Sequence, residues 1–549
     1  MNRENTVIMD ILKNQILFSE LDDSDISRLA LDFEFVSLAS GTSLYTENDP
    51  AEYFYIVAKG TLSISVLKGK RRQKYATFTV GDYFGQECLD EGIHGDKALA
   101  FDDVEYLRLP KTRLLSLLKQ YPRINRSLRI TAESRKMARR KLFKWLDEDE
   151  AVYMITRKHE FFLYIKMLLP MVFMVGFLLL IGWGTVESNR SYMIVGFTVL
   201  LISIGLLVWL WRDWGNDYYA VTSKRVLWIE KVILLYDSRQ EAPLSTILTS
   251  NVQSFFSLRL LIDYGTVNVK TYTGEIPMKR IRAPEQMVEF INGQQKRTSD
   301  LSKLIDNDVM EVVIGQRLGL IDEKSIQSKK TPQPLPKHEV KSTATGNIFI
   351  DFIKMRYVQG DKITYRKHWF VLLKKIWLQS LVFVGLFILL YYLYQTEQIN
   401  QTTAGIWLFV SFLIFGISIY QYIDWRNDIY VITVEHIYDI ERKPLGREDK
   451  KSASLENILS LEHSRVGILG LMLNYGTVTI NVGTEKFQFY GVFNPAQVQS
   501  EIFARMSAQQ RRTEELEAVK DRNRVADWIA IYHKQTEKLN ISPSHPENI

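Results

Sequence analysis

The chain has 549 residues, of which 46% are hydrophobic and 24% are charged, and its formal net charge is +6. This composition is that of a folded protein and excludes wholesale disorder, while the mild charge gives no reason to expect nucleic acid as a partner. The single cysteine, Cys88, excludes an intramolecular disulfide framework, a cysteine-based zinc cluster and a CxxC redox pair.

The first predicted domain spans residues 1–122. Runs typical of short β-strands lie at 34–38, 42–45, 53–58, 61–67, 75–78 and 104–109. Turn residues and glycines separate these runs, which is typical of a β-barrel or jelly roll. Two helical patterns follow, one over 111–121 and one from Arg123 to Asp147.

Five short motifs in this domain carry a family resemblance. They are Leu17-Phe18, Gly41, Phe54–Val57 with Gly60, Gly81–Gly85 and Ala100–Glu105. Together these motifs resemble a cyclic nucleotide-binding domain. The resemblance implies a phosphate cassette, in which a short helix offers N–H groups and an arginine pairs with the cyclic phosphate. It also implies a glutamate after Phe-Gly that binds the ribose hydroxyl.

The cassette of this chain departs from that pattern. Gln86 stands at the glutamate position beside Glu87, and His94 stands at the arginine position, with Lys97 as the nearest alternative cation. The candidate ligand-binding residues are Gly85, Gln86, Glu87, His94 and Lys97, with a cyclic nucleotide as the candidate ligand and no further cofactor. A neutral histidine cannot replace a guanidinium, and four nearby acids oppose an anion. These acids are Glu87, Asp90, Glu91 and Asp96. The alternative is a degenerate sensor fold that serves another ligand or a protein contact.

A basic helix is predicted over 123–150, next to the membrane. Arg123 to Lys144 contains nine Lys or Arg residues and one acid, Glu133. Contact with anionic lipid headgroups would contribute ~1 kcal/mol per basic residue near the surface. The candidate lipid contacts are Arg135, Lys136, Arg139, Arg140 and Lys141. A solvated helix face that only enforces orientation is the alternative, and no nucleic-acid recognition motif accompanies the segment.

Four uncharged runs predict four transmembrane helices. The runs are 167–186, 191–211, 376–396 and 398–423. Each reaches the ~20 residues that a helix needs to cross the hydrocarbon core, and a short polar turn joins each pair. We therefore expect one hairpin within 151–214 and a second within 351–425.

Flanking charge predicts the orientation of both hairpins. Lys and Arg cluster before the first and third runs and follow the second and fourth, whereas Arg190 is the only basic residue in either turn. Cytoplasmic flanks carry the excess of Lys and Arg. We therefore expect a protein of the bacterial inner membrane in which both turns face outward. The N-terminus, the segment between the hairpins and the C-terminus should all lie in the cytoplasm.

The sequence repeats itself at an offset of 211 residues. The stretch 213–219 recurs at 424–430, and Tyr-Gly-Thr-Val at 264–267 recurs at 475–478. After each hairpin comes a module rich in β-branched and aromatic runs, at 215–295 and 426–505, which closes on a helix pattern that begins at a proline. A curled sheet with one C-terminal helix has a pleckstrin-homology-like (PH-like) outline.

These repeated motifs also resemble a family. A membrane hairpin followed by DWxND, YGTV and a closing helix is similar to the bacterial PH-like membrane proteins of the YdbS-like type. The resemblance implies a small PH-like barrel beside the membrane and implies no known reaction. The second copy departs from the first where Lys450-Lys-Ser452 replaces Arg239-Gln-Glu241, so the first copy fits the resemblance better.

One polar motif recurs where a membrane helix becomes a strand. Its members are Asp213, Asn216 and Asp217 in the first copy and Asp424, Asn427 and Asp428 in the second. These groups could bind a headgroup, a cation or a partner. We favour a structural role, in which they cap the helix end and fix the strand entry through hydrogen bonds to the backbone. No metal site is expected in the chain.

The sequence predicts a multidomain α+β membrane protein. Its parts are a jelly-roll sensor domain, four transmembrane helices, two PH-like barrels, a linker over 296–350 and a charged helical tail over 506–549. No HExxH, GxSxG, Walker A or kinase signature is present, so we expect a non-enzymatic ligand-sensing or regulatory protein. Its expected partners are the lipid bilayer, a protein and further copies of the chain. An oligomeric scaffold with a non-binding sensor domain is the alternative. A transporter or channel is disfavoured, because the uncharged runs offer no intramembrane charge for an ion path.

Overall fold

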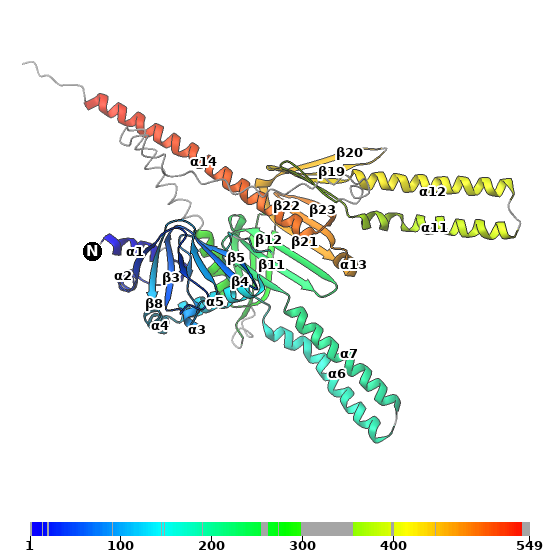
Figure 1. Ribbon diagram of the computed structural model, residues 1–549, viewed down its shortest axis with the longest axis horizontal. Coiled ribbons are helices and arrows are strands. Elements are labelled where there is room, and N and C mark those ends of the chain that lie inside the picture. Colours follow the sequence, from blue (N-terminus) through cyan, green and yellow to red (C-terminus); the bar gives the residue numbers. More distant parts are fainter. Residues whose placement is uncertain are drawn as a thin grey trace, which may run out of the picture. The chain divides into compact units, whose positions relative to one another are not determined.

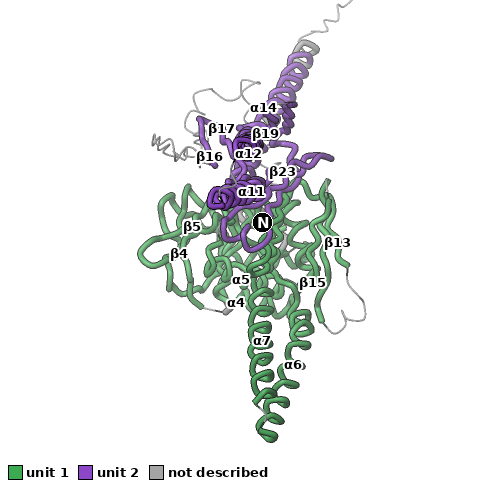
Figure 2. The backbone as a smooth tube through the Cα atoms, turned by 90° about the vertical axis from the view of Figure 1, so that its right-hand side faces the viewer, with its two compact units in different colours: residues 1–301 green, residues 302–549 purple. Residues whose placement is uncertain are grey.

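The computed structural model describes residues 3–253, 262–297 and 355–540, apart from residues 14, 19, 20, 91, 144, 148, 189, 273, 397–399 and 445. The chain divides into two compact units, residues 1–301 and residues 302–549, which Figure 2 colours separately. From residue 298 to 350, the predicted linker lies outside the described residues, and so does the end of the tail from residue 541.

The N-terminal domain is a sandwich of two open, antiparallel four-stranded sheets. One sheet has the order β1 (Glu34–Leu38), β8 (Val104–Pro110), β3 (Tyr53–Lys59), β6 (Tyr83–Phe84). The other has the order β2 (Ser43–Tyr45), β7 (Lys97–Ala100), β4 (Leu62–Lys68), β5 (Arg71–Phe78). Neither sheet closes on itself, so the domain is a sandwich and not the closed barrel that the sequence also allowed.

Helices flank this sandwich. They are α1 (Arg3–Lys13), α2 (Asp23–Ala30), α3 (Glu87–Asp90), α4 (Lys111–Gln120) and α5 (Pro122–Lys141). The side chain of Asp22 caps α2 by accepting a bond from the Asp25 N–H, and α5 begins at a proline, which suits the first turn of a helix. The sequence predicted this last helix to reach Asp147, but α5 ends at Lys141 because Leu142 turns left-handed with φ 46°.

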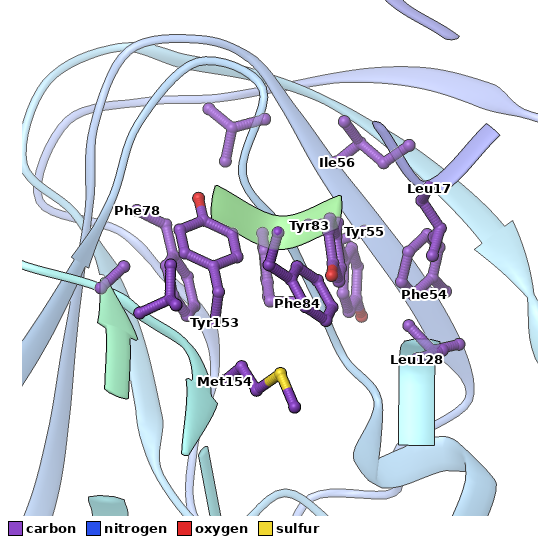
Figure 3. Packing of buried hydrophobic residues seen from close by; sticks show 14 of the residues in the cluster. Leu17, Phe54, Tyr55, Ile56, Phe78, Tyr83, Phe84, Leu128, Tyr153 and Met154 are labelled. Carbon is purple, nitrogen blue, oxygen red and sulfur yellow. The ribbon is translucent and has the colours of Figure 1, made fainter. Parts of the chain in front are cut away.

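The core of the sandwich continues into the part that follows it. In β3, Phe54 and Ile56 point to one face of the strand and Tyr55 to the other, and all three are buried. Figure 3 shows Tyr153 and Met154 beside Phe78 and Phe84 of the sandwich. The sandwich and the strand after α5 therefore share one hydrophobic cluster.

The remainder of the first unit surrounds the first hairpin. Its elements are β9 (Val152–Thr156), α6 (Glu160–Val186), α7 (Arg190–Trp214), β10 (Tyr218–Thr222), β11 (Arg225–Val232), β12 (Tyr236–Pro243), β13 (Ile247–Gln253), β14 (Tyr264–Thr271) and β15 (Gly274–Arg282). Strands β9 to β12 pair antiparallel in sequence order, and β13, β14 and β15 form a three-stranded sheet. Residues 284–297 then form a helix that begins at a proline, as the sequence predicted.

The described elements of the second unit are β16 (Arg356–Gln359), β17 (Lys362–Arg366), α11 (Trp369–Gln395), α12 (Gln401–Asn427), β18 (Ile429–Ile432), β19 (His436–Arg442), β20 (Glu448–Ser454), β21 (Ile458–Val466), α13 (Gly467–Met472), β22 (Tyr475–Val482), β23 (Glu485–Phe493) and α14 (Pro495–Asn540). From β17 onward, these described elements repeat the order of one strand, two long helices, six strands and a closing helix, with the short helix α13 after the fifth strand. Strands β17 to β20 pair in order, as do β21 to β23, and α14 packs its first turns into the core between them. Helix α14 runs on without a break, so the predicted tail helix is its continuation.

Equivalent elements lie at the offset seen in the sequence. Strand β14 begins at Tyr264 and β22 at Tyr475, which is 475 − 264 = 211 residues later. The isolated bridge between Lys158 and Ile281 also has an equivalent, between Lys367 and Val492. Among the described residues, no sheet in either unit is closed.

Four helices are long and apolar enough to cross a membrane: α6, α7, α11 and α12 (Figure 1). They have 25 to 27 residues each, which gives about 40 Å at 1.5 Å per residue and exceeds the ~30 Å of a hydrocarbon core. No more than 11% of the most apolar window of each helix is buried inside the protein. An apolar surface of this size suits contact with lipid and not with water.

Candidate functional site

The cassette predicted from the sequence lies between β6 and β7. It opens at Gly85, whose φ of 87° belongs to the left-handed region. A Cβ at this position would lie 2.6 Å from the carbonyl oxygen of Tyr53, so only glycine fits. The chain then enters the single turn of α3 with Gln86 and Glu87 at its start.

His94 is buried, and its burial disfavours the positively charged form of the ring. Its side chain is 1% exposed and stacks on Tyr45, with 3.6 Å between the ring centroids and 7° between the planes. Burial lowers the pKa of His94 below its ordinary value, against the opposing effects of Asp96 and Asp49. The position predicted to replace the phosphate-binding arginine therefore supplies no guanidinium-like partner.

Asp96 makes the cassette acidic. It is 2% exposed, and the hydroxyl of Tyr75 donates to its Oδ2. Burial, followed by the neighbouring charge of Glu87, raises the pKa of Asp96 to about 6. The sequence pointed to this acid only as one of four that oppose an anion, and the structure buries it 3.7 Å from a basic side chain, Arg139.

The cation that enters the cassette is Arg139 of α5. Its Nη1 lies 3.3 Å from Glu87 Oε1 and 3.7 Å from Asp96 Oδ2, and its side chain is 12% exposed. The basic stretch of sequence predicts that Arg139 contacts lipid, whereas in the structure Arg139 enters the cassette. The sequence signal for this position is helical spacing, because Arg135 and Arg139 are four residues apart and lie on one face of the helix.

Arg135, a second candidate lipid contact, is also buried. Its Nε donates to the carbonyl oxygen of Val152 at 3.1 Å and its Nη1 to that of Tyr83 at 2.5 Å. Its guanidinium lies 4.6 Å from the centre of the Phe78 ring. Both arginines leave the lipid-facing set because α5 packs between the sandwich and strands β9 to β11. Lys136 is half-buried, and Arg140 and Lys141 remain exposed.

A cavity of about 310 Å³ lies between α5 and the start of the cassette, beside the contact of Arg139 with Glu87. It is lined by Gln86, Glu87, Ala132, Glu133, Arg135, Lys136 and Arg139. Gln86 Nε2 and Arg135 Nη2 are buried there without a hydrogen-bond partner among the described residues. Of the predicted ligand-binding residues, Gln86 and Glu87 line this cavity. Gly85, His94 and Lys97 do not, and Lys97 lies on β7 opposite Ser65 of β4.

The loop before the cassette is tied to the membrane-hairpin part of the unit. Asp82 accepts a hydrogen bond from Arg297 Nη1 at 2.8 Å and another from the Tyr153 hydroxyl. Arg297 Nη2 also donates to the carbonyl oxygen of Val80 at 2.6 Å. Tyr153 belongs to β9, the strand before the first hairpin, and Arg297 belongs to the helix over 284–297. Two elements of the first unit that lie outside the sandwich therefore hold the loop that precedes the cassette.

The repeated polar motif makes matching ion pairs. Lys158 Nζ lies 2.8 Å from Asp217 Oδ2, and Lys367 Nζ lies 2.6 Å from Asp428 Oδ2. Asp217 Oδ1 also accepts from the Lys231 N–H at 3.0 Å. Each aspartate thus connects the strand before a hairpin with the strand after it, a geometry that suits the structural role expected for the motif.

The remaining members of the motif lie beside these pairs. Asp213 Oδ1 accepts from the Ile233 N–H at 3.4 Å, and the Asn216 N–H donates to the carbonyl oxygen of Asp213. In the second unit, Asp424 pairs with Lys375 at 2.9 Å and Asn427 is the last residue of α12. No group of three or more His, Cys, Asp or Glu side chains that could hold a metal ion occurs in the described part of the chain.

The first unit contains a buried ion network around Arg225, and the residues at the equivalent positions of the second unit differ. Arg225 Nη2 lies 2.9 Å from Glu150 Oε2, and Arg225 Nη1 lies 2.9 Å from Glu241 Oε2. At the offset of 211, the second unit has His436 and Ser452 in place of Arg225 and Glu241. The difference that the sequence showed between Arg239–Glu241 and Lys450–Ser452 therefore coincides with the buried network.

Residues 35–121 match the family model of the cyclic nucleotide-binding domain. Among similar solved structures is the N-terminal domain of a transcriptional regulator from Streptomyces coelicolor A3(2), at 25% identity, covering 24% of this chain and 95% of that chain with a TM-score of 0.20. The sensor domain of the transcriptional regulator DNR from Pseudomonas aeruginosa is 18% identical, covering 26% of this chain and 95% of that chain with a TM-score of 0.23.

The catabolite activator protein of Thermus thermophilus is also similar, at 23% identity, with 23% of this chain and 61% of that chain covered and a TM-score of 0.21. No curated protein matches the chain. Residues 35–121 therefore form a cyclic nucleotide-binding domain, in a chain whose four apolar helices fit a membrane protein.

Proposed function

We propose that this chain is a non-enzymatic, polytopic membrane protein in which the cyclic nucleotide-binding domain regulates the membrane units. The observation that carries the proposal is the contact of Asp82 with both Arg297 and Tyr153. Asp82 lies three residues before the cassette's Gly85. A change in the cassette would therefore be transmitted to β9, which leads into the first hairpin, and to the helix over 284–297.

Each membrane unit is proposed to be a hairpin joined to a PH-like domain. In support, four antiparallel strands, three antiparallel strands and a helix follow each other in both units, and they share one core in the second unit. Asp217 and Asp428 form equivalent ion pairs in the two units, which supports the proposal that both units are copies of one structural repeat. These domains would lie on the cytoplasmic side of a bacterial inner membrane.

The proposed partners are anionic lipid headgroups, a protein and other copies of this chain. Arg140 and Lys141 are exposed at the end of α5, although the Lys141 ammonium also lies over the Phe143 and Tyr218 rings. A regulatory step requires a ligand or partner that favours one arrangement of the unit over another. A cyclic nucleotide is the first ligand to test, because the domain family is named for it.

The test uses the full-length protein in lipid nanodiscs. Cyclic AMP, cyclic GMP or a cyclic dinucleotide is added at up to millimolar concentration, and amide hydrogen exchange is followed in β9 and in residues 284–297. Slower or faster exchange there on binding, abolished by Arg297→Ala but kept in Lys296→Ala, supports regulation. Binding that leaves exchange in both segments unchanged would refute it.

A scaffold with a ligand-independent domain is the second candidate. The observation that favours the scaffold is the position of Arg139, whose guanidinium already lies beside the acidic side chains of the cassette. The scaffold predicts a large symmetric assembly of the full chain in detergent, with the same mass at every ligand concentration. A change of mass with ligand would favour regulation instead.

A further inference from the structure

The acidic side chains of the cassette converge on one basic group of the same chain. Glu87 comes from α3, Asp96 precedes β7, and Arg139 reaches both from α5. Glu87 Oε2 and Asp96 Oδ1 are buried and accept no further hydrogen bond among the described residues. The cassette thus has unused acceptors, which suit a donor such as a guanidinium better than an anion.

The backbone is shaped for a flat cation. Arg139 lies directly over Gly95, where an added Cβ would be 2.4 Å from Cζ, 2.6 Å from Nη1 and 2.7 Å from Nη2. All three guanidinium atoms are closer to that Cβ position than real atoms come. A side chain at position 95 would therefore require the Arg139 guanidinium to shift from its place in the cassette.

We propose that the cassette is a guanidinium-binding site, which the chain fills with its own Arg139, so that a phosphodiester is rejected. Glu87 and Asp96 would hold an alkylguanidinium through charge-assisted hydrogen bonds. A cyclic phosphate would instead bring a third negative group beside these two acids. The canonical arrangement of charges is therefore inverted: the acids belong to the cassette, and the basic group belongs to the helix.

The occupant also determines how α5 is held. Arg139 lies two residues before the end of α5 at Lys141, and β9 begins eleven residues after that end, at Val152. Release of Arg139 would free the last turn of the helix that leads to the first hairpin. This regulatory consequence rests on the proposed function, whereas the occupancy of the site by a guanidinium does not.

Chemical rescue in the full-length protein tests the occupancy. Arg139→Ala should empty the slot and raise hydrogen exchange in residues 136–141 by roughly tenfold, because the last turn loses its contact with the cassette. Ethylguanidinium at millimolar concentration should restore the slow exchange, whereas ethylammonium at the same concentration should not, since it lacks the planar fork. Arg140→Ala is the matched control, because Arg140 is the next residue and is exposed.

Two further variants keep the test decisive if Arg139→Ala does not fold. Arg139→Lys retains the charge and should still exchange faster and respond to ethylguanidinium. Gly95→Ala should displace the wild-type arginine and raise exchange in the same turn. Equal rescue by ethylguanidinium and ethylammonium, or wild-type exchange in all three variants, would overturn the proposal.

A cyclic nucleotide arm separates this inference from the proposed function. The wild type should bind cyclic AMP no more tightly than millimolar. Micromolar binding to the wild type would overturn the guanidinium site and leave regulation intact. Conversely, guanidinium rescue of residues 136–141 without any change in β9 or residues 284–297 would sustain the site and refute regulation through it.

Discussion

Arg297 Nη1 lies 2.8 Å from Asp82 Oδ1, although the two residues are 215 positions apart in the chain. Asp82 is fully buried, and burial alone would raise its pKa. The charge of Arg297 and hydrogen bonds from Arg297, the Thr79 N–H and the Tyr153 hydroxyl outweigh that effect and lower the pKa of Asp82 overall. Asp82 is thus ionised and paired, which makes this contact a strong link between the sandwich and the rest of the first unit.

We predict that Arg297→Ala loosens this link. It leaves the buried Asp82 without its cationic partner, and breaking such a pair costs about 3–5 kcal/mol. Limited proteolysis should cut the β5–β6 loop faster in the variant. Lys296→Ala is the control, since Lys296 is exposed on the same helix. Equal cleavage rates in the two variants would show that the Arg297 contact does not hold the loop.

The Arg225 network gives a second prediction. Arg225→Ala leaves Glu150 and Glu241 buried without this cationic partner, so we expect a loss of about 3–5 kcal/mol in the first unit. His436→Ala at the equivalent place in the second unit should cost less than about 1 kcal/mol. Hydrogen exchange measured in β11 and in β19 reports the stability of the first and second units separately. A loss in β19 as large as that in β11 would contradict the asymmetry.

The matching ion pairs predict matching effects. Asp217→Asn and Asp428→Asn should each weaken the strand entry after their own hairpin, by about 1–2 kcal/mol because both pairs are only partly exposed to solvent. Exchange should rise in β10 for the first variant and in β18 for the second. If instead only lipid or cation binding changes, while exchange in both strands stays as in the wild type, the motif has a binding role.

Periodic and repeated features could be predicted from the sequence, and pairings across the fold could not. The four apolar helices and the strand runs of the sandwich follow from length and alternation, which are local properties. The place of Arg139 does not, because nine basic residues near the membrane favour a lipid surface. Arg135 is buried and Arg139 is half-buried because α5 packs between the sandwich and β9. The ion pair between Arg297 and Asp82 likewise depends on tertiary packing, and no local sequence pattern predicts it.

The raised pKa of Asp96 predicts a dependence on pH. Its value of about 6 in the folded state lies above the ordinary 3.8, so its contribution to stability is full below pH 3.8 and is lost as the pH rises through 6. The groups that face it are Glu87 of α3, Tyr75 of β5, Arg139 of α5 and the neighbouring His94.

His94 acts in the opposite direction, because its lowered pKa makes its protonation unfavourable to folding as the pH falls below 6.5. The comparison of wild type with Asp96→Asn isolates the carboxyl group. Relative to that variant, the wild type should gain about 1 kcal/mol between pH 7 and pH 5. Urea unfolding at the two pH values, followed by exchange in β5 and β7, measures the difference. A constant difference between the two proteins would exclude an elevated pKa.

The charge pattern around the hairpins predicts which side of the membrane each turn faces, and the single cysteine makes this measurable. Cys88 is fully buried, so the wild type should not react with a membrane-impermeant maleimide. Ser188→Cys lies in the exposed turn between α6 and α7 and should be labelled in spheroplasts with an intact inner membrane. Arg140→Cys, on the exposed face of α5, should be labelled only after that membrane is permeabilised. The reverse labelling pattern would place the sandwich outside the cell. That orientation would contradict the prediction from the excess of Lys and Arg, which normally keeps the flanks of a hairpin in the cytoplasm.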